Sequence, residues 1–437
     1  MKRMRRIEWA VYILTALYQV GSLAVILVGT GGELSYAKWT EVEGVLYYSP
    51  EKYQAAGPLL AGLAVTLLAE TAVVLWGIHM RSGLAGCAAV FGMLLYHGML
   101  LQAFYNGGEN LKRHIFFAAA GFFCMILYYF LCRVRLDDRK LRWVIGGTAA
   151  LIAVQLFCLL AGVVSGGGIN GSYAWLSFAG VTVQPGESLK VAVILLSACC
   201  YKIRINRRLS YIYMALCGGS AVVLAACRDL GNAAVLVILL VVSSYFLFDD
   251  WMVSAEIFLA ATIGVVASVI CVPYVRARFF QCFHALDSGT GQHYQSVMAI
   301  VRGGLKGMGA GGDTVSATWV TSSSTDFGVN VLTAIFGVPV LILLAGLLVL
   351  LLVQLLWTPV LSPFHYMMGL LSAVVLFAQY VLHMGGGLDI LPFTGICASF
   401  ISQGGSNMIS SFLLWGGVLV SFSPAFEKLR KEKEYDT

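Results

Sequence analysis

Runs of about 20 apolar residues recur along the chain with short polar stretches between them, and this pattern constrains the fold more than any other feature. A helix needs roughly 20 apolar residues to cross a lipid bilayer. Hydrophobic residues make up 59% of the sequence and charged residues 11%, less than half the charged share of an ordinary soluble domain. The sequence therefore predicts an all-α polytopic membrane protein with about 12 transmembrane helices, near residues 9–29, 58–78, 84–104, 114–132, 143–165, 188–201, 209–227, 230–248, 252–275, 328–356, 361–384 and 405–423.

The first apolar run starts at Trp9, after the basic segment MKRMRR, and no small-residue cleavage site precedes the polar stretch that begins at Gly31. We therefore expect this run to be kept as a membrane anchor and not removed as a signal peptide. Most of the eleven cysteines fall inside apolar runs, without a CxxC pair or a Cys/His ligand spacing. We interpret them as small packing residues.

The positive charges indicate how the spans are oriented. If the N-terminus is cytoplasmic, the segments MKRMRR, HMRSG, RVRLDDRKLR, KIRINRRLS and EKLRKEKEYDT lie inside and hold 18 of the 28 Lys and Arg residues, against 9 outside and Lys190 near a span end. This bias predicts an even number of spans with both termini in the cytoplasm. The net charge of +6 is explained by these short loops, so the sequence predicts no nucleic-acid partner.

The same orientation places three longer polar segments outside the membrane, at 30–57, 166–187 and 276–327. The last is about fifty residues long, and loops of that length are usually functional or disordered. It carries acidic, basic and histidine side chains among many glycines, so we expect chemistry there. We divide the chain into an N-terminal transmembrane extension at 1–142 that can overlap the core, a core at 143–423 that includes the loop 276–327, and a charged cytoplasmic tail at 424–437.

Four polar stretches stand out near the ends of predicted spans. They read NGSYAWLSFAGVTVQPGESLK (170–190), CRDLGNA (227–233), QSVMAIVRGGLKGMG leading on to TDF (295–309 and 325–327), and LPFTGICASFISQGGSN (391–407). In this order they resemble the NGAxRW and QPSExxK, QPDLGTA, QSLIAIGSGGLxGKG with HTDFIF, and LPVTGxPLPFxSYGGSS motifs of the SEDS family (shape, elongation, division and sporulation), which includes FtsW, RodA and SpoVE. Four such motifs in the correct order and topology are far stronger evidence than one. The resemblance covers residues 143–423.

The resemblance implies a core of ten helices, so two N-terminal spans look additional here. Several motif positions differ from the family pattern. Ser324 stands in place of His, Ala334 and Ile335 in place of two glutamates, Ala174 in place of Arg, and Arg228 in place of Pro. The chain is therefore identified as a divergent member of the family.

The resemblance implies a peptidoglycan glycosyltransferase that polymerises lipid II, an undecaprenyl pyrophosphate disaccharide-peptide, at the outer face of the bacterial cytoplasmic membrane. Its cellular process would be cell shape, division or sporulation, and its implied partner is a class B penicillin-binding protein whose transpeptidase domain cross-links the strands. In this reaction a sugar hydroxyl attacks an anomeric carbon, and a carboxylate that accepts the proton is worth about 10²–10⁴-fold. By resemblance, Asp326 is that catalytic base. The residues alone favour a helix N-cap for Asp326, because Thr or Asp ahead of an apolar run is typical of a helix start; the third motif reverses this preference.

The leaving pyrophosphate is anionic, so the site must supply positive charge or backbone N–H groups. A divalent cation, Mg²⁺ or Mn²⁺, could replace part of this charge with Asp326 or Asp287 as an oxygen ligand, although no spacing specifies a metal site. For Arg276 and Arg278, contact with lipid head groups is as good an interpretation as substrate binding. The basic candidates on or near the outer side are Lys190, Arg276, Arg278, Arg302 and Lys306.

The other predicted site residues come from the same motifs. Gly303, Gly304 and the glycines up to Gly312 allow the backbone to approach a phosphate or to form a re-entrant loop, with a flexible loop as the alternative. Glu187 and Lys190 are three residues apart, so on a helix they share a face and can form an ion pair. The resemblance adds as substrate-binding residues Gln184, Gln295, Ser296, Ser402, Gly404, Gly405 and Ser406, and as supporting residues Trp175, Asp229, Pro392 and Gly395.

Two other functions fit parts of the sequence. Twelve spans and interrupted glycine-rich segments at 301–312 and 384–405 would accommodate a flippase or transporter for a lipid-linked sugar. The departures at the His, Glu and Arg positions would suit a non-catalytic scaffold that recruits a transpeptidase. Asp326 distinguishes these hypotheses best, because only the enzyme requires its carboxylate for chain extension.

Overall fold

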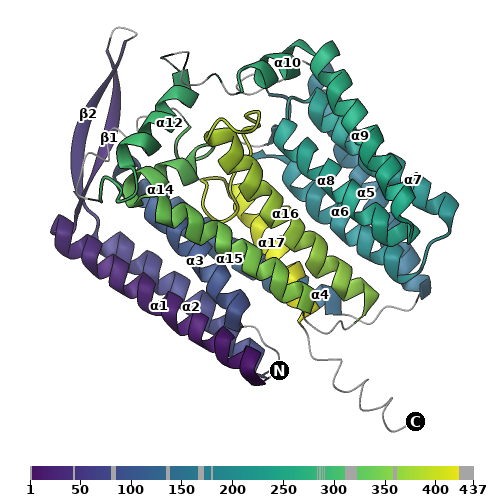
Figure 1. Cartoon of the computed structure of the whole chain (residues 1–437), viewed down its shortest axis with the longest axis horizontal. Coiled ribbons are helices and arrows are strands. Elements are labelled where there is room, and N and C mark those ends of the chain that lie inside the picture. Colours follow the sequence, from purple (N-terminus) through teal and green to yellow (C-terminus); the bar gives the residue numbers. More distant parts are fainter. Residues whose placement is uncertain are drawn as a thin grey trace.

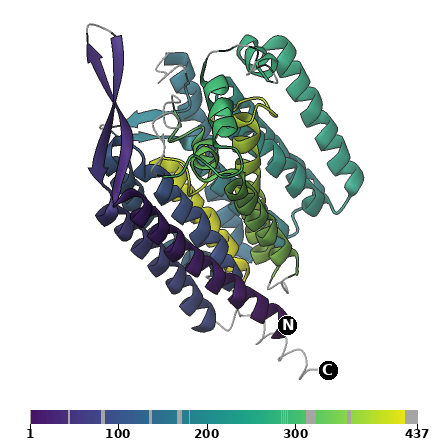
Figure 2. The same ribbon diagram turned by 60° about the vertical axis from the view of Figure 1, so that its left-hand side comes forward.

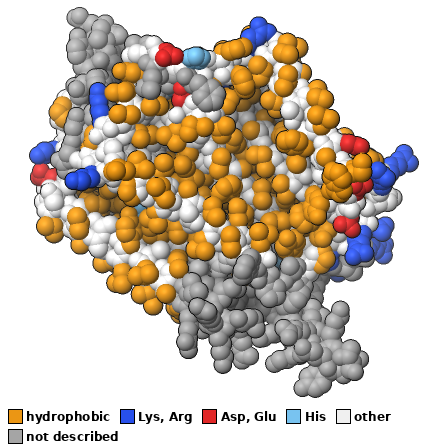
Figure 3. Space-filling model, in the orientation of Figure 1, with side chains coloured by type: hydrophobic (Ala, Val, Ile, Leu, Met, Phe, Trp, Pro, Cys, Tyr) orange, Lys and Arg blue, Asp and Glu red, His pale blue; other side chains and the backbone are white. Residues whose placement is uncertain are grey.

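The computed structural model describes residues 2–42, 45–79, 85–133, 138–165, 172–178, 181–282, 284, 287, 289, 291–310, 322–357 and 362–422. These residues form a bundle of long helices with a β-hairpin standing at one end (Figure 1). Hydrophobic side chains cover most of the face drawn in Figure 3, and charged side chains gather at its edges. This distribution is that of a multi-pass membrane protein.

Ten of the described helices are long and apolar enough to cross a membrane. Two more helices, α6 (Pro185–Lys202) and α17 (Gly405–Ser421), occupy the other two predicted spans; α6 carries three charged residues, and α17 has 17 residues. The predicted total of twelve therefore stays a prediction. The ten are α1 (Lys2–Thr30), α2 (Ala56–His79), α3 (Ala85–Ala103), α4 (Glu109–Arg133), α5 (Asp138–Ser165), α7 (Arg207–Ala226), α8 (Leu230–Phe248), α9 (Trp251–Cys271), α15 (Val338–Trp357) and α16 (Pro363–Gly387).

The segment predicted as one long span at 328–356 is two helices, so that prediction was wrong. Helix α14 (Gly328–Phe336) ends at Gly337, and α15 begins at the next residue. Gly337 has a left-handed φ of 86°, and a Cβ there would collide with the carbonyl oxygen of Leu305. The close approach of the 305–307 backbone, which only glycine permits, breaks the helix.

Two hairpins were missed by the all-α prediction. Strands β1 (Glu33–Val42) and β2 (Val45–Gln54) pair antiparallel with Glu33 opposite Gln54, and β3 (Leu176–Phe178) pairs with β4 (Val181–Val183). The first hairpin stands on the corner between α3 and α4, which contains the short 3₁₀ helix η1 (Asn106–Gly108). There the Tyr53 hydroxyl donates to the carbonyl of Ala103 at 2.5 Å.

Helix α3 lies at the centre of the bundle, and all of its 19 residues are buried. Helices α1 and α2 pack against it on one side. Where these three helices meet, Gln19 donates from Nε2 to the Glu70 carboxylate at 2.5 Å, and Gly92 of α3 leaves room for that carboxylate. A hydrogen-bonded partner lowers the cost of placing an acid inside a membrane bundle.

Helices α6, α8 and α17 all begin at the end of the bundle where the hairpin stands, while α1 begins and α17 ends at the opposite end (Figures 1 and 2). Local sequence explains two of these starts. Pro185 occupies the first turn of α6, where its fixed φ is favourable. The Asp229 side chain caps α8 by accepting from the backbone N–H of Asn232.

Candidate functional site

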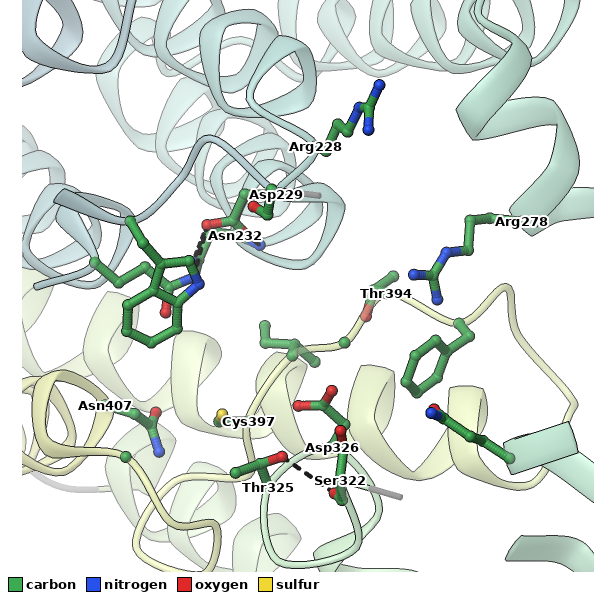
Figure 4. Close-up of a pocket in the computed structure, with 18 of the residues that line it drawn as sticks. Arg228, Asp229, Asn232, Arg278, Ser322, Thr325, Asp326, Thr394, Cys397 and Asn407 are labelled. Atoms are coloured by element: carbon green, nitrogen blue, oxygen red, sulfur yellow. Dashed lines mark hydrogen bonds between the residues drawn. The ribbon is translucent and has the colours of Figure 1, made fainter. Parts of the chain in front are cut away.

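A cavity of about 1100 Å³ opens where these helix starts meet. Its described lining comes from the starts of α6, α8 and α17, from α10 (Pro273–Phe280), and from the first residues of α12 (Gly291–Gly303). The turn 322–327, the loop 393–397, and Ser172, Trp175 and Thr182 from the chain around the hairpin of β3 and β4 also contribute. Figure 4 shows polar side chains from these separate segments facing one space. A cavity with convergent polar groups at one end of a bundle is the usual location of a ligand site.

The turn that carries Asp326 is fixed by hydrogen bonds to its own backbone. The N–H groups of Thr325 and Asp326 both donate to the carbonyl of Ser322, at 3.0 and 2.9 Å. The Ser402 hydroxyl donates to the carbonyl of Thr325 at 2.5 Å. The carbonyl of Ser324 also accepts from Gln102 Nε2 of α3 at 3.1 Å and from the N–H of Gln403 at 2.8 Å. Two other segments, α3 and the loop before α17, therefore hold the turn.

The Asp326 carboxylate points into the cavity (Figure 4). Burial raises the pKa of its carboxyl to about 6, against the opposing effects of a hydrogen bond with Thr325 and the positive charge of Arg278. An acid that titrates close to neutral pH is well matched to proton transfer. The N-cap of α14 is Phe327, and no side-chain hydrogen bond caps this helix. The alternative interpretation of Asp326 as that cap therefore does not apply.

Glu187 and Lys190 form the ion pair that their spacing predicted. Lys190 Nζ lies 2.9 Å from each oxygen of the Glu187 carboxylate, and Lys190 is completely buried. Ser410 of α17 also donates its hydroxyl to Glu187, which ties α6 to α17. Glu187 lines the cavity and Lys190 does not, so the pair reaches the cavity through its carboxylate partner.

Asp229 lies in a second polar cluster beside this pair. Its carboxylate accepts from Gln184 Nε2 at 2.8 Å and from Asn232 Nδ2 at 2.9 Å. Burial raises the pKa of Asp229. The backbone N–H of Gln184 in turn donates to the Ser406 hydroxyl at 3.3 Å, which joins the first and fourth motifs across the cavity.

The cavity brings together about half of the predicted site residues. The first and fourth motifs meet Asp326 there, although they are more than a hundred residues apart in sequence. The predicted residues in the lining are Trp175, Gln184, Glu187, Asp229, Arg278, Asp326, Gly395, Gly404 and Ser406.

The remaining predicted residues lie outside the described lining. Arg276 is exposed and donates from Nε to the carbonyl of Val269 at 3.3 Å. Ser296 accepts from Asn330 Nδ2 at 2.7 Å, so it joins α12 to α14. The residues outside the lining are Lys190, Arg276, Gln295, Ser296, Gly303, Gly304, Lys306, Pro392, Ser402 and Gly405, and Arg302 is also exposed away from it.

Two glycines of the third motif, Gly303 and Gly307, lie against protein backbone. A Cβ at Gly303 would collide with the carbonyl of Ala334, and one at Gly307 with the carbonyl of Ile335. The N–H groups of Met308 and Gly309 donate to these same two carbonyls, at 3.0 and 2.9 Å. These two glycines and the two hydrogen bonds therefore pack the 303–309 segment onto α14. The predictions that fall on Asn170, Gly171, Gly311 and Gly312, and on the tail 424–437, lie outside the described residues.

Sequence reasoning missed several residues of the cavity wall. Arg228, Tyr274 and Phe393 line it beside Arg278. His293 also lines it, and burial lowers the pKa of this imidazole. Arg228 and Phe393 were visible in the sequence only as departures from motifs, while Tyr274 carried no motif signal.

A divalent cation remains a prediction. Asp287 is exposed and pairs with His284 at 2.9 Å, and it does not line the cavity with Asp326. In the part of the chain that the structure describes, no group of three or more His, Cys, Asp or Glu residues could hold a metal ion. The described residues therefore do not fit a protein-built metal site, and no step below depends on one.

The chain is similar to known proteins along most of its length. Residues 73–424 match the family described as cell cycle protein, FtsW/RodA/SpoVE. Stage V sporulation protein E of Bacillus subtilis is 26% identical over 356 residues, which cover 76% of this chain and 92% of that protein. A probable peptidoglycan glycosyltransferase FtsW of Borreliella burgdorferi is 26% identical over 279 residues, which cover 61% of this chain and 76% of that protein.

Two solved structures share the fold. A chain from the work "Structural coordination of polymerization and crosslinking by a peptidoglycan synthase complex" superposes with a TM-score of 0.57 at 22% identity, covering 76% of this chain and 95% of that one. The rod shape determining protein RodA of Thermus thermophilus gives a TM-score of 0.51 at 20% identity, covering 76% of this chain and 93% of that one. With the family match extending over more than half of the sequence, these findings show that the chain belongs to the FtsW/RodA/SpoVE (SEDS) family.

Proposed function

We propose that the protein is a peptidoglycan glycosyltransferase that polymerises lipid II. The observation that carries this proposal is the placement of Asp326, a half-buried carboxylate with a pKa raised to about 6, inside a large cavity that it shares with arginine side chains. Relatives named as probable peptidoglycan glycosyltransferases support the same reaction.

The chemistry follows from this arrangement. An acceptor sugar hydroxyl attacks the anomeric carbon of the donor, and a carbon–oxygen bond forms there while the bond from that carbon to the pyrophosphate oxygen breaks. The pyrophosphate leaves with the bonding electrons, and Asp326 accepts the proton of the hydroxyl. An ionised Asp326 is required at the start of each cycle, and cationic groups stabilise the departing charge.

We place this cavity at the outer face of the bacterial cytoplasmic membrane, with both termini in the cytoplasm. The excess of Lys and Arg in the loops at the opposite end of the bundle supports this orientation. The partner we propose is a class B penicillin-binding protein, whose transpeptidase would cross-link the new strands. The likeness to a chain from a peptidoglycan synthase complex supports such a partner.

The test is chain extension of fluorescent lipid II by the purified protein with its co-purifying partner. We expect the wild type to form glycan polymers, and Asp326→Ala to form none while its expression and partner binding stay intact. Polymer formation by Asp326→Ala at the wild-type rate would rule out the proposed base.

The departures from the family motifs make a non-catalytic scaffold the second candidate. Ala334 and Ile335, which replace two glutamates, are fully buried against the 303–309 segment and do not line the described cavity. A wild type that forms no polymer, together with an Asp326→Ala variant that complements a deletion in cells, would favour the scaffold. Transfer of labelled lipid II across sealed vesicles without polymerisation would favour a flippase.

A further inference from the structure

Two arginines that line the cavity share one aromatic ring. The guanidinium carbons of Arg228 and Arg278 each lie 5.4 Å from the ring centroid of Tyr274. The two cations therefore cannot be farther apart than twice this distance. Arg228 comes from the turn between α7 and α8, whereas Tyr274 and Arg278 belong to α10, so residues distant in sequence converge here.

Each guanidinium also lies over a second ring. Arg228 lies 5.5 Å from the ring centroid of Tyr173, and Arg278 lies 5.0 Å from that of Phe393. Stacking of this kind orients the flat guanidinium group while its N–H donors at the edge remain able to bind an anion. The repulsion between two such neighbouring cations is offset when an anion binds between them.

Two carboxylates lie near this pair of cations. Asp229 adjoins Arg228 in sequence, and its two oxygens accept from Asn232 and Gln184. Asp326 lies across the cavity, where it experiences the positive charge of Arg278 (Figure 4). The cavity therefore has a cationic wall that faces the carboxylate we assign as the base.

The sequence supports a relocation of positive charge to Arg228. The family pattern carries Arg at position 174 and Pro at position 228, and this chain has Ala174 and Arg228. The segments lie side by side, because the Ser172 hydroxyl and the Tyr173 N–H both donate to the carbonyl of Cys227, at 3.2 and 3.0 Å. The two substitutions together keep one arginine in these adjoining segments and change the segment that supplies it.

We infer that Arg228 and Arg278, oriented by Tyr274, form a diphosphate-binding subsite for a polyprenyl diphosphate. Two guanidinium groups offer paired N–H donors to two adjacent phosphates, an arrangement that a monophosphate cannot fill. During transfer the leaving diphosphate gains the bonding electrons, so the same contacts strengthen as the bond breaks. The identity of the polyprenyl ligand rests on the proposed function; the anion site itself rests on the geometry.

The test measures binding without turnover. The full-length protein in nanodiscs is titrated with undecaprenyl pyrophosphate, undecaprenyl monophosphate and inorganic pyrophosphate, in the presence and absence of phosphatidylglycerol. We expect Arg228→Gln and Arg278→Gln each to weaken binding of undecaprenyl pyrophosphate by about 10- to 100-fold, the effect of losing one charge-assisted contact. Arg228→Lys should also weaken it, because lysine keeps the charge and loses the planar, paired donors.

The matched control is Arg207→Gln. Arg207 lies 6.0 Å over the ring of Tyr211 at the start of α7, away from the cavity, so this variant removes an equal charge and a similar stacking contact. Its affinity should stay within about twofold of the wild type. Thermal unfolding of each variant verifies that it is folded.

Several results would overturn the inference. Among them are unchanged affinity in both cavity variants, equal weakening by Arg207→Gln, equal affinity for the monophosphate, and displacement of the ligand by phosphatidylglycerol at equal mole fraction. Polymerisation is assayed in parallel. If the wild type polymerises lipid II while Arg228→Gln and Arg278→Gln bind the diphosphate normally, this inference fails and the proposed function stands. If the variants lose binding and the wild type forms no polymer, the subsite stands and the proposed function fails.

Discussion

Asp326 illustrates how opposing local effects set the chemistry of one residue. Burial raises the pKa of its carboxyl, while Thr325 and Arg278 favour the ionised form, and the result is a pKa of about 6. Such a group is largely ionised at neutral pH and still basic enough to accept a proton. At the scale of a single residue, burial therefore makes this acid suitable for proton transfer.

The first prediction is a pH profile. A base must be ionised to act, so the polymerisation rate should fall as pH decreases through about 6 and level off above it. Initial rates with labelled lipid II between about pH 5 and 8 measure this. A rate that stays constant down to the ordinary pKa of aspartate would contradict the assignment.

The second prediction concerns stability at the same residue. Because the carboxyl of folded Asp326 has a pKa of about 6 against an ordinary value of 3.8, the folded state binds the proton more tightly and loses stability as pH rises through this window. Asp326→Asn resembles the protonated form. At pH above 7 the variant should be more stable than the wild type by about 1–2 kcal/mol. This is less than the whole pKa difference would give, because the carboxyl is partly exposed to solvent. The activity of the variant should fall by about 10²–10⁴-fold.

Thermal unfolding in detergent at several pH values measures this difference, which should shrink as pH falls from about 6 to about 4 and vanish below that. A stability difference that is the same at all pH values would show that Asn acts through packing and not through the charge.

The third prediction tests the buried pair of Glu187 and Lys190. Among the described residues, Lys190→Met leaves the buried carboxylate with Ser410 as its one side-chain hydrogen-bond donor, so it should destabilise the protein by about 3–5 kcal/mol. The double variant Glu187→Gln/Lys190→Met removes both charges and should recover most of the loss. Unfolding by a denaturing detergent compares the two, and equal losses would mean that charge pairing is not the cause.

At the scale of elements, the boundaries of α14 and α15 depend on a contact that sequence alone does not display. Gly337 lies against the backbone of Leu305 and Gly307, and the N–H of Val338 donates to the carbonyl of Gly304 at 3.1 Å. The fourth prediction is that Gly337→Ala destabilises the protein by about 2 kcal/mol or more and lowers polymerisation, because alanine is strained at this φ and its Cβ meets backbone.

Gly346 provides the control for that variant. It lies inside α15 with open space around its position, so Gly346→Ala should be neutral or stabilising by up to about 1 kcal/mol. Comparable losses in the two variants would show that the break between the helices is not the cause.

Much of this architecture could be predicted from sequence, because apolar runs mark helices regardless of their neighbours. The positions of most predicted spans correspond to described helices. The break at Gly337, the hairpin of β1 and β2, and the cavity wall around Tyr274 could not be predicted, since each depends on contacts between distant segments. The motifs identified Asp326 and its cavity partners Glu187 and Asp229, but they could not separate lining residues from packing glycines such as Gly303.

At the scale of the whole molecule, the residues before position 73 lie outside the family match. They form α1, the hairpin and most of α2, and they contact the rest of the protein through α3, α4 and the corner at η1. Gln102 of α3 in turn donates to the carbonyls of Ser324 and Ile401, both at 3.1 Å. The N-terminal unit is thus packed on the helix that holds the Asp326 turn.

The fifth prediction concerns sidedness. Ser49 of the hairpin and Arg208 at the start of α7 are exposed and lie at opposite ends of the bundle. In a Cys271→Ser background, which removes the exposed native cysteine, Ser49→Cys should react with a membrane-impermeant maleimide in intact cells. Arg208→Cys should react only after the membrane is opened, and the reverse pattern would invert the proposed orientation.

The interruption between α14 and α15 has a mechanical consequence. Helix α15 is apolar and only partly buried by protein, and a spanning helix of this kind is expected to adjust its tilt to bilayer thickness. Helix α14, which follows Asp326, is almost wholly enclosed by protein. A single continuous rod would transmit each tilt to the carboxylate, whereas a joint between the two helices absorbs it. The carboxylate proposed as the base is thereby isolated from motions of the surrounding lipid.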